Sequence, residues 1–534
     1  MADLPVFTYQ TRIHLQPPQN EALEAYAELY GKAERTLFAA TESGIDAMDL
    51  KQEYRLLFGI TARQFNAIRI GLQGKVKSIE ELRPQQIAEA KVRIGKAEKR
   101  IARLEKTQPG SEKLHQKKRR LVGLFERLKA MKEDQAAGTV RLCFGSRKLF
   151  RAQFALEANG YKDHSEWKAD WLKSRSSQFF VLGSKDETEG NQSCQAKVEE
   201  NGTLRLTLRL PNALSETQGK FLVIPGVKFA YGHDAIVAAL GSSARVKATT
   251  ATQKKIVKRT GTALSYRFVR DTKGWRVFVS LEAQPIEKAT DSQAGAIGID
   301  LNADHLAFAE TDRFGNLIDF RRFDCAVYGK TKEQATAILG DAAARIAEGA
   351  KLAAKPVVIE ELDFQNKKAE LESADRRGAR MLSSFAFNKT ATSIKSACFR
   401  AGVEVVEVNP AYTSVIGAVN YARSKGIPTH QGAAYAIARR GLGMSERPTC
   451  RVAVVPARKG GHVTFALPVR NRAKHVWSFW SNVKTRLKAA HQAHFRCGAH
   501  KKAPPPLPRP NPAACATGSP RRDSVASIAR STVR

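Results

Sequence analysis

The sequence predicts a multidomain α+β protein, because stretches with different residue patterns follow one another along the chain. Residues 16–140 are rich in Ala, Lys, Arg and Glu and space their apolar residues as helices do. Residues 141–292 contain several runs in which apolar and polar residues alternate, as in half-buried strands. In residues 293–496 short apolar runs alternate with helical segments, which is typical of an α/β domain. A strand is expected within residues 1–15, and the basic, proline-rich residues 497–534 are expected to be disordered.

The first elements are a strand and two helices. Residues 5–14 alternate and predict the strand, and two prolines that follow are expected to end it. An amphipathic helix is predicted from about residue 20 to residue 40, and a second helical pattern covers residues 61–72.

Two basic helices are predicted to form a hairpin. The first covers residues 84–104, with Pro84 in its first turn, where a missing N–H costs least. The second begins near Ser111 and carries four adjacent cations, Lys117, Lys118, Arg119 and Arg120. Such a hairpin is either a solvated arm or an arm that holds a nucleic-acid backbone, and four adjacent cations fit the second interpretation as well as the first.

The region of residues 141–292 is predicted to be mainly β. Residues 203–210 alternate cleanly, and residues 264–270 and 275–281 flank a turn and predict a β-hairpin. Alternating positions of these strands hold arginines: Arg205, Arg209, Arg267 and Arg276. One such strand has an ordinary solvated face, but several strands in a strongly basic chain favour a surface for RNA or DNA.

The C-terminal domain is predicted to run through three strands and then helix, strand, helix, strand and helix. The strands are expected at residues 296–301, 305–310, 317–321, 356–360 and 403–408. The helices are expected at residues 332–353, up to about Ala401, from about His430 to Gly441, and at residues 474–496. An acid, Asp300, lies on the first strand, and Glu360 ends the strand after the first helix. This is the layout of an RNase H-like fold.

The charge balance points to a polyanionic partner. The chain has 88 Lys and Arg residues against 52 Asp and Glu residues, a formal net charge of +36 over 534 residues. This excess repels itself unless a polyanion neutralises it, and it goes well beyond what solubility needs. Nucleic acid is therefore the expected partner.

The sequence also excludes several classes of protein. No apolar run reaches the roughly 18 residues that a membrane span needs, and the first residues lack the pattern of a signal peptide. The seven cysteines are scattered and form no Cys-x-x-Cys, which argues against a disulfide framework and a four-cysteine zinc site. We expect a cytoplasmic, nucleoid-associated protein that makes no membrane contact.

Asp300 and Glu360 suggest a metal site. Sites of RNase H-like folds use carboxylates to hold two divalent metals, which stabilise the attacking and leaving oxygens of a phosphodiester. Asp300 would bridge the metals and Glu360 would hold one of them, with Mg²⁺ as the expected ion because it prefers oxygen ligands. Each residue also has an ordinary alternative. Asp300 could cap a turn, and His430 could simply begin a helix. Glu360 could pair with a lysine, or Glu361, which points to the opposite face, could take the role in its place.

Three motifs resemble the RuvC nuclease motifs of the transposon-encoded TnpB proteins and of the related type V CRISPR effectors. They are Gly-Ile-Asp300-Leu-Asn, Val-Val-Ile-Glu360-Glu-Leu-Asp and His430-Gln-Gly-Ala-Ala, the last of which normally reads Asp-x-Asn-Ala-Ala. Asn-Pro-Ala-Tyr-Thr413-Ser is similar to the stretch that precedes the zinc ribbon of this family. The resemblance is specific over about residues 294–445 and weaker upstream.

The chain departs from the family pattern at two places. The zinc ribbon is missing, because the interval 415–428 holds no cysteine and Gly417 and Asn420 occupy what we expect to be a short loop, so no zinc is expected. His430 stands where the family has its third acid. A neutral imidazole can bind a metal or act as a base, but it brings no negative charge. Asp300, Glu360 and His430 should then bind Mg²⁺ or Mn²⁺ less tightly than three acids do.

The resemblance implies an RNA-guided DNA endonuclease encoded by a mobile element, with a guide RNA and target double-stranded DNA as partners. It implies a helical recognition lobe (16–140), a β-rich wedge domain with an OB-like barrel (141–292, with the strand of 1–15) and a RuvC-like domain (293–496). The candidates for contact with nucleic acid are Lys117, Lys118, Arg119, Arg120, Arg147, Lys148, Arg376, Arg377, Arg439 and Arg440.

Two alternatives to a working nuclease stay open. The first is an RNA-guided DNA-binding protein whose RuvC site is weak or inactive and which acts by occupying DNA. The second, less favoured, is a transposase that joins DNA ends itself.

Overall fold

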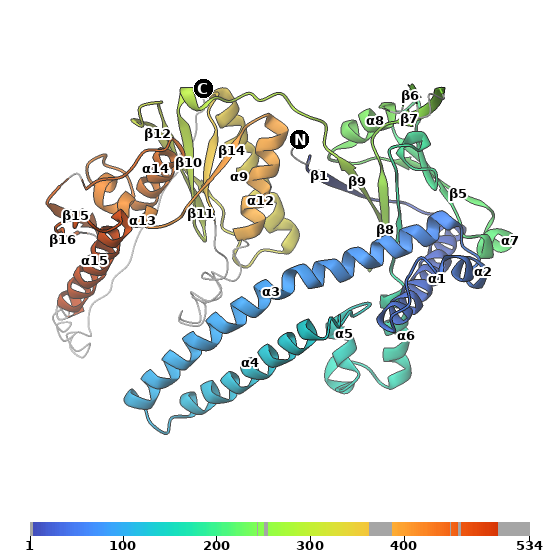
Figure 1. Cartoon of the computed structure of the whole chain (residues 1–534), viewed down its shortest axis with the longest axis horizontal. Helices are drawn as coiled ribbons and strands as arrows, with labels where there is room; N and C mark the ends of the chain where they lie inside the picture. Colours follow the sequence, from blue (N-terminus) through green and yellow to red (C-terminus); the bar gives the residue numbers. More distant parts are fainter. Residues whose placement is uncertain are drawn as a thin grey trace, which may run out of the picture.

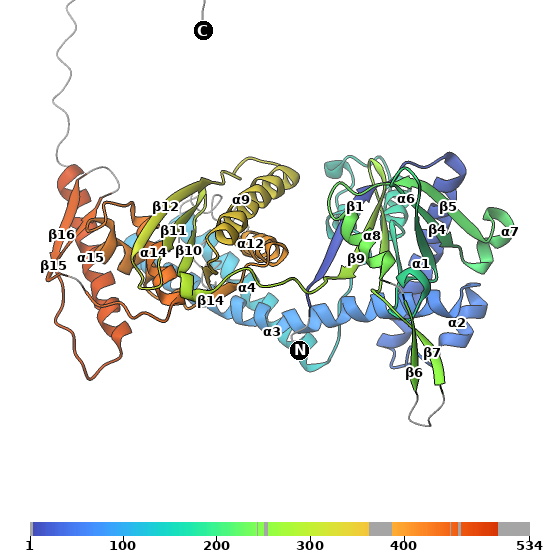
Figure 2. The ribbon, with the colours of Figure 1, turned by 90° about the horizontal axis from the view of Figure 1, so that it is seen from above.

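The computed structural model describes residues 4–242, 244–249, 255–361, 387–448, 450–457 and 461–499. Arg376 and Arg377, two of the expected nucleic-acid contacts, lie outside these ranges, as does the chain beyond residue 499 that was expected to be disordered. Two groups of sheets lie side by side, with the N-terminal strands in one group and the C-terminal α/β domain in the other (Figures 1 and 2).

The N-terminal group is built on two antiparallel sheets. One has the order β1 (Val6–Arg12), β9 (Gly274–Glu282), β8 (Ser265–Asp271) and β2 (Gln178–Val181). The other has the order β3 (Cys194–Val198), β4 (Leu204–Arg209) and β5 (Phe221–Val227). The predicted strand at residues 203–210 and the predicted hairpin are therefore confirmed. The OB-like barrel stays a prediction.

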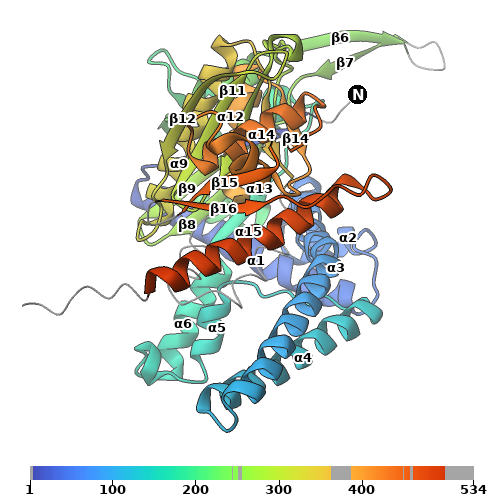
Figure 3. The same cartoon turned by 90° about the vertical axis from the view of Figure 1, so that its left-hand side faces the viewer.

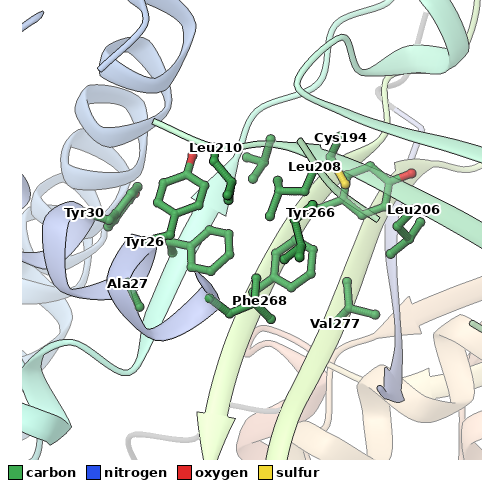
Figure 4. Packing of buried hydrophobic residues seen from close by; sticks show 14 of the residues in the cluster. Tyr26, Ala27, Tyr30, Cys194, Leu206, Leu208, Leu210, Tyr266, Phe268 and Val277 are labelled. Atoms are coloured by element: carbon green, nitrogen blue, oxygen red, sulfur yellow. The ribbon is translucent and has the colours of Figure 1, made fainter. Parts of the chain in front are cut away.

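Both sheets share one core with helix α1 (Pro17–Glu42). Tyr26 of α1 stacks on Phe179 with ring centres 4.2 Å apart, and Phe179 stacks in turn on Phe268. Figure 4 shows Tyr26 and Phe268 beside Leu208 of β4. α1 begins at Pro17, because the two prolines that were expected to precede it fit the first turn of a helix.

Several shorter elements complete this half of the molecule. They are α2 (Lys51–Leu57), α5 (Arg147–Ala152), α6 (His164–Arg175), α7 (Ser215–Gln218), α8 (His233–Gly241) and the hairpin of β6 (Ala244–Thr249) and β7 (Lys255–Thr260).

A long helical hairpin extends from this core (Figure 1). The two helices predicted at residues 61–72 and 84–104 are wrong as separate elements, because α3 (Ala62–Thr107) is continuous and holds Pro84 in its interior. A proline there removes one backbone hydrogen bond and costs about 3 kcal/mol. Apolar residues of α3 pack on α4 (Glu112–Ala136) and offset this cost, and Arg83 beside the proline donates to the carbonyls of Asp134 and Thr139 at 2.9 and 2.7 Å.

The C-terminal domain has the element order that the sequence predicts. Its sheet runs β12 (Leu317–Asp324), β11 (His305–Thr311), β10 (Ala296–Leu301), β13 (Val357–Glu360) and β14 (Val405–Val408). β10, β11 and β12 pair antiparallel, whereas β13 and β14 run parallel to β10. Helices α9 (Lys332–Leu352) and α12 (Phe387–Ala401) pack on one face, and α14 (Thr429–Gly441) packs on the other.

The segment expected as a short loop is instead a buried helical layer. α13 (Thr413–Ile416) continues into a π-helical turn, Gly417–Ala422, in which Gly417 and Asn420 are buried. A Cβ on Gly417 would lie 2.3 Å from the backbone nitrogen of Ala433, so only glycine lets this turn lie against α14. The loop prediction was wrong because this contact comes from a distant part of the chain.

A β-hairpin and a helix cover this layer, and the sequence pattern did not predict the hairpin. β15 (Val452–Pro456) pairs with β16 (His462–Ala466), and both lie beside α15 (Val476–Ala499) and α13 (Figure 3). None of the described helices is both long enough and apolar enough to cross a bilayer.

Candidate metal centre

The register of two parallel strands sets Asp300 beside Glu360. Ile299 of β10 pairs with Ile359 of β13, so the next residue of each strand is an acid at the same level of the sheet. Adjacent strands lie about 4.8 Å apart, and paired residues of neighbouring strands point to the same face. Glu361 follows on the opposite face, and its backbone N–H donates to the carbonyl of Val408. Asp300 and Glu360 therefore share one face and one end of the sheet.

This face is the one that α14 covers. Ile297 and Ile299 pack into the core on the other side, with α9 and α12. On the α14 side, a Cβ on Gly298 would lie 2.0 Å from the carbonyl oxygen of Ala434 and 2.5 Å from the nitrogen of Ala438. The helix backbone thus rests directly on the strand, and this close approach brings the start of α14 to Asp300.

Asp300 and His430 are in direct contact. Asp300 is 6% exposed, and its Oδ2 accepts hydrogen bonds from Asn302 Nδ2 at 3.0 Å and from His430 Nδ1 at 3.2 Å. An ionised carboxylate can only accept, so the proton of a neutral His430 resides on Nδ1. Nε2 then keeps its lone pair, on a side chain that is 51% exposed. The imidazole can accept a proton or bind a cation from solvent.

Glu360 is held by the loop that follows β14. Its carboxylate accepts a hydrogen bond from the hydroxyl of Thr413, at the start of α13. Arg440 approaches from α14; burial lowers the pKa of its guanidinium, and the charge of Glu360 opposes that shift. Glu360 thus has a fixed position and a nearby cation.

His305 completes this face, although no sequence motif pointed to it. Asp300 pairs with Ala307 across the antiparallel β10–β11 ladder, so His305, two residues before Ala307, lies on the same face. Its ring is 3% exposed and lies 5.0 Å from the ring of His430, at an interplanar angle of 80°. Only the polar pair Asp304-His305 at the start of the second strand could have indicated it.

The residues on this face have the chemistry of a cation site. Two carboxylates supply negative charge, and His305 Nε2 is buried without a hydrogen-bond partner. Among the described residues, no three His, Cys, Asp or Glu side chains converge closely enough to hold a metal ion. The structure brings Asp300 and His430 together and places Glu360 on the same face of the sheet.

The expected basic contacts on the arm and on α5 have different surroundings. On α4, Lys118 forms an ion pair with Glu105 at 2.8 Å, and Arg119 is exposed. Arg147 and Lys148 are exposed at the start of α5. Arg147 lines a groove of about 600 Å³ whose wall combines cations and aromatic rings: Arg141, Arg151, Arg175, Phe144, Phe150 and Trp171.

Arg439 and Arg440, two of the expected contacts with nucleic acid, both have partners within the protein. Arg439 donates to Glu446 at 2.9 Å and to the carbonyl of Gly315 at 2.7 Å, and its guanidinium lies 5.9 and 5.7 Å from the ring centres of Tyr421 and Tyr435. Arg440 donates to the carbonyls of Asn409 and Ala411. Their role in contact with nucleic acid stays a prediction.

No protein-family model matches this chain, and no curated protein is similar to it at a significant level. Solved structures do show likenesses. RuvC of T. thermophilus in complex with a Holliday junction substrate is 20% identical over 28% of this chain and 97% of that chain, with a TM-score of 0.20. A Cas12f1–sgRNA–target DNA complex is 12% identical over 81% of this chain and 99% of that chain, with a TM-score of 0.20.

A third structure, a CRISPR–Cas12f ternary complex, is 12% identical over 83% of this chain and all of that chain, also with a TM-score of 0.20. These TM-scores are low, so the function of this chain is inferred from its own residues and their contacts.

Proposed function

We propose that this chain is an RNA-guided DNA endonuclease of the TnpB type, encoded by a mobile element and acting on DNA in the cytoplasm. Asp300, Glu360 and His430 are its site for Mg²⁺ or Mn²⁺. The observation that carries the proposal is the matched register of β10 and β13, which sets two acids side by side beneath the first turn of α14. Acids at the ends of adjacent buried strands require a cation or a cationic partner.

The residues of this chain prepare the site for hydrolysis. A bound divalent cation would supply charge for the phosphodiester oxygens and lower the pKa of a bound water. Asp300 fixes the tautomer of His430, so that Nε2 would present its lone pair to that cation. The first turn of α14 presents the positive end of the helix dipole, which favours the carboxylates and the phosphate of a substrate rather than the cation itself.

The rest of the molecule supplies the surface for a guide RNA and target DNA. The net charge of +36 favours binding to two polyanions at once. The α3–α4 arm and the groove lined by Arg147 are the described surfaces that would contact phosphate.

A guided cleavage assay tests the proposal. The protein is purified with its copurifying RNA, that RNA is sequenced, and a plasmid carrying the matching sequence is offered with Mn²⁺ or Mg²⁺. We expect guide-dependent cleavage that falls about 100-fold or more in Asp300→Ala, since several kcal/mol of metal stabilisation is lost. Guide-independent cleavage, or cleavage that Asp300→Ala leaves unchanged, would contradict the proposal.

A second candidate function is guided DNA binding without cleavage. Two observations favour it: among the described residues no three metal-binding side chains converge, and His430, which stands where the family has an acid, bonds directly to Asp300. This alternative predicts guide-dependent DNA binding that is the same in Asp300→Ala and no cleavage with either metal.

A further inference from the structure

Helix α5 and the turn that follows it carry an exposed row of alternating cations and aromatic rings. The row consists of Arg147, Phe150, Arg151 and Phe154. Residues that follow Arg147 by three, four and seven positions share its face of a helix. The rings of Phe150 and Phe154 lie edge to face with centres 6.2 Å apart, which confirms that they share this face. Phe150 is 44% exposed and Phe154 is 76% exposed.

The opposite face of α5 is covered by α6, beside which it lies in Figure 1. Trp167 of α6 is buried, and its indole N–H donates to the carbonyl of Leu149 at 2.8 Å. Trp167 also stacks on Trp171, whose ring centre lies 5.5 Å from that of Phe150. These contacts fix α5 on α6 and leave Phe154 exposed. Two neighbouring exposed rings on a fixed helix indicate a surface that a partner covers.

The charge around this row is positive and uncompensated. Arg147 and Arg151 line both the groove of about 600 Å³ and a smaller hollow of about 450 Å³, and the described walls of both contain no Asp or Glu. Within the described part of the chain, these two arginines form no ion pair, and neither does Arg175 in the wall of the groove. The guanidinium of Arg175 lies 5.5 Å from the ring centre of Trp171, and its Nε is buried without a hydrogen-bond partner. Neighbouring cations of this kind favour an anion as the partner.

A nucleotide with an unpaired base has the chemistry that complements this surface. Its phosphate is an anion, and its base is a flat ring that stacks on an exposed aromatic side chain. A duplex hides the faces of its bases, whereas loops and bulges of a folded RNA present them. The proline-rich residues 497–534 of this chain could also suit an aromatic surface, but they are basic and would be repelled by the arginines.

We propose that the α5 face formed by Arg147, Phe150, Arg151 and Phe154 binds an unpaired stretch of the guide RNA. The phenylalanine rings stack on unpaired bases, and the arginines bind the adjoining phosphates. This inference rests on the proposed binding of a guide RNA and is independent of the metal site. It gives the surface a preference for single-stranded RNA, which charge alone would not create because a duplex carries the higher charge density.

RNA binding to the full-length protein, freed of its copurifying RNA, tests this proposal. Fluorescence anisotropy measures the affinity for a single-stranded oligoadenylate RNA and for its duplex with oligouridylate. Phe154→Leu keeps an apolar side chain but removes the ring, whereas Phe154→Tyr keeps the ring. The matched control is Tyr231→Leu, which changes an 84% exposed aromatic residue between β5 and α8.

We expect Phe154→Leu to weaken binding of the single strand about tenfold and to leave binding of the duplex within about twofold of the wild type. Phe154→Tyr and Tyr231→Leu should bind both RNAs as the wild type does. The slope of log affinity against log salt should not change in Phe154→Leu, because both arginines remain. Since Phe154 is 76% exposed, thermal unfolding should show that Phe154→Leu is folded and melts at the wild-type temperature.

The results separate this inference from the proposed function. Unchanged single-strand affinity in Phe154→Leu, or an equal loss for single strand and duplex, overturns the inference alone. Tighter binding of single-stranded DNA of the same sequence overturns the choice of RNA as the occupant. A wild type that binds neither form of RNA overturns the proposed RNA-guided function. The expected effect of Phe154→Leu in a protein that shows no guided cleavage overturns the proposed nuclease and supports this face as an RNA-binding surface.

Discussion

At the scale of single residues, the shared face of Asp300 and Glu360 could be predicted from the sequence, but the neighbours of these acids could not. Asp300 and Glu360 each follow a short apolar run, and strand periodicity fixes which way they point. His305 reaches them through the register of β10 and β11, which depends on pairing between strands. Arg439 donates a hydrogen bond to Glu446, a loop residue whose position cannot be predicted from helix or strand periodicity.

Restoring the third acid should change the metal preference. We expect His430→Asp to raise guided cleavage in Mg²⁺ about tenfold, because a third carboxylate adds the negative charge and oxygen ligand that Mg²⁺ prefers. Initial rates in Mg²⁺ and in Mn²⁺ measure the change. A lower rate in Mg²⁺ would indicate that His430 acts as a base that aspartate cannot replace.

Two buried thiols should resist alkylation at neutral pH. Burial raises the pKa of Cys325 to about 11 and that of Cys398 to about 12. Only the thiolate reacts, so a raised pKa leaves both groups protonated until the pH approaches these values. With iodoacetamide at pH 8, mass spectrometry should find the exposed Cys450 modified and these two intact. Equal labelling of all three would contradict the packing of this domain.

At the scale of elements, strands with regular alternation were predicted well, whereas helix limits were not. β4 and the β8–β9 hairpin lie where alternation and a turn indicated them. The predicted helix start at Pro84 was wrong, because a proline usually lies in the first turn of a helix. Here packing against α4 keeps α3 continuous through Pro84. The buried helical layer around Gly417 was not predicted either, because its contacts come from another element, α14, and not from its own sequence pattern.

The contact between β10 and α14 should tolerate no side chain at Gly298. Gly298→Ala would place a Cβ against the backbone of α14 and push His430 away from Asp300. We expect a loss of about 3 kcal/mol or more in the free energy of unfolding, as for other overpacked cores, and loss of Mn²⁺ binding. Urea unfolding followed by tryptophan fluorescence measures the first effect.

The matched control is Gly340→Ala on α9, where a Cβ meets nothing within 4 Å. A helical glycine replaced by alanine should stabilise the protein by up to about 1 kcal/mol. Similar losses in both variants would show that α14 does not rest on the strand as described.

At the scale of the whole molecule, the charge of +36 is the main basis for the proposed binding of nucleic acid. The charge is concentrated in no single motif, so the sequence predicts a class of partner but not the surface that would bind it. The sequence named Arg147 as a contact with nucleic acid, which stays a prediction, and it did not predict the groove in which Arg151, Arg175 and Trp171 join it through the fold.

Removing one cation of this groove should weaken RNA binding in a salt-dependent way. We expect Arg147→Ala to lower the affinity for the copurifying RNA and to reduce the slope of log affinity against log salt by about 1. Filter binding between 50 and 300 mM KCl, a range chosen to bracket about 150 mM physiological salt, measures both. The control is Lys129→Ala on α4, which changes a lysine whose side chain is 79% exposed and pairs with Glu133. An equal change in affinity and slope in this control would contradict a specific role of the groove in RNA binding.

The proposed nuclease depends above all on β10 and β13, which bring Asp300 and Glu360 together to cut DNA. Its sharpest test compares Glu360→Gln with Glu361→Gln, two neighbouring acids that point to opposite faces of the strand. Guided plasmid cleavage in Mn²⁺ is measured for both, at equal occupancy of the target DNA. We expect a loss of about 100-fold or more in Glu360→Gln and near wild-type cleavage in Glu361→Gln. Equal rates in the two variants, or a loss only in Glu361→Gln, would refute this assignment of the site.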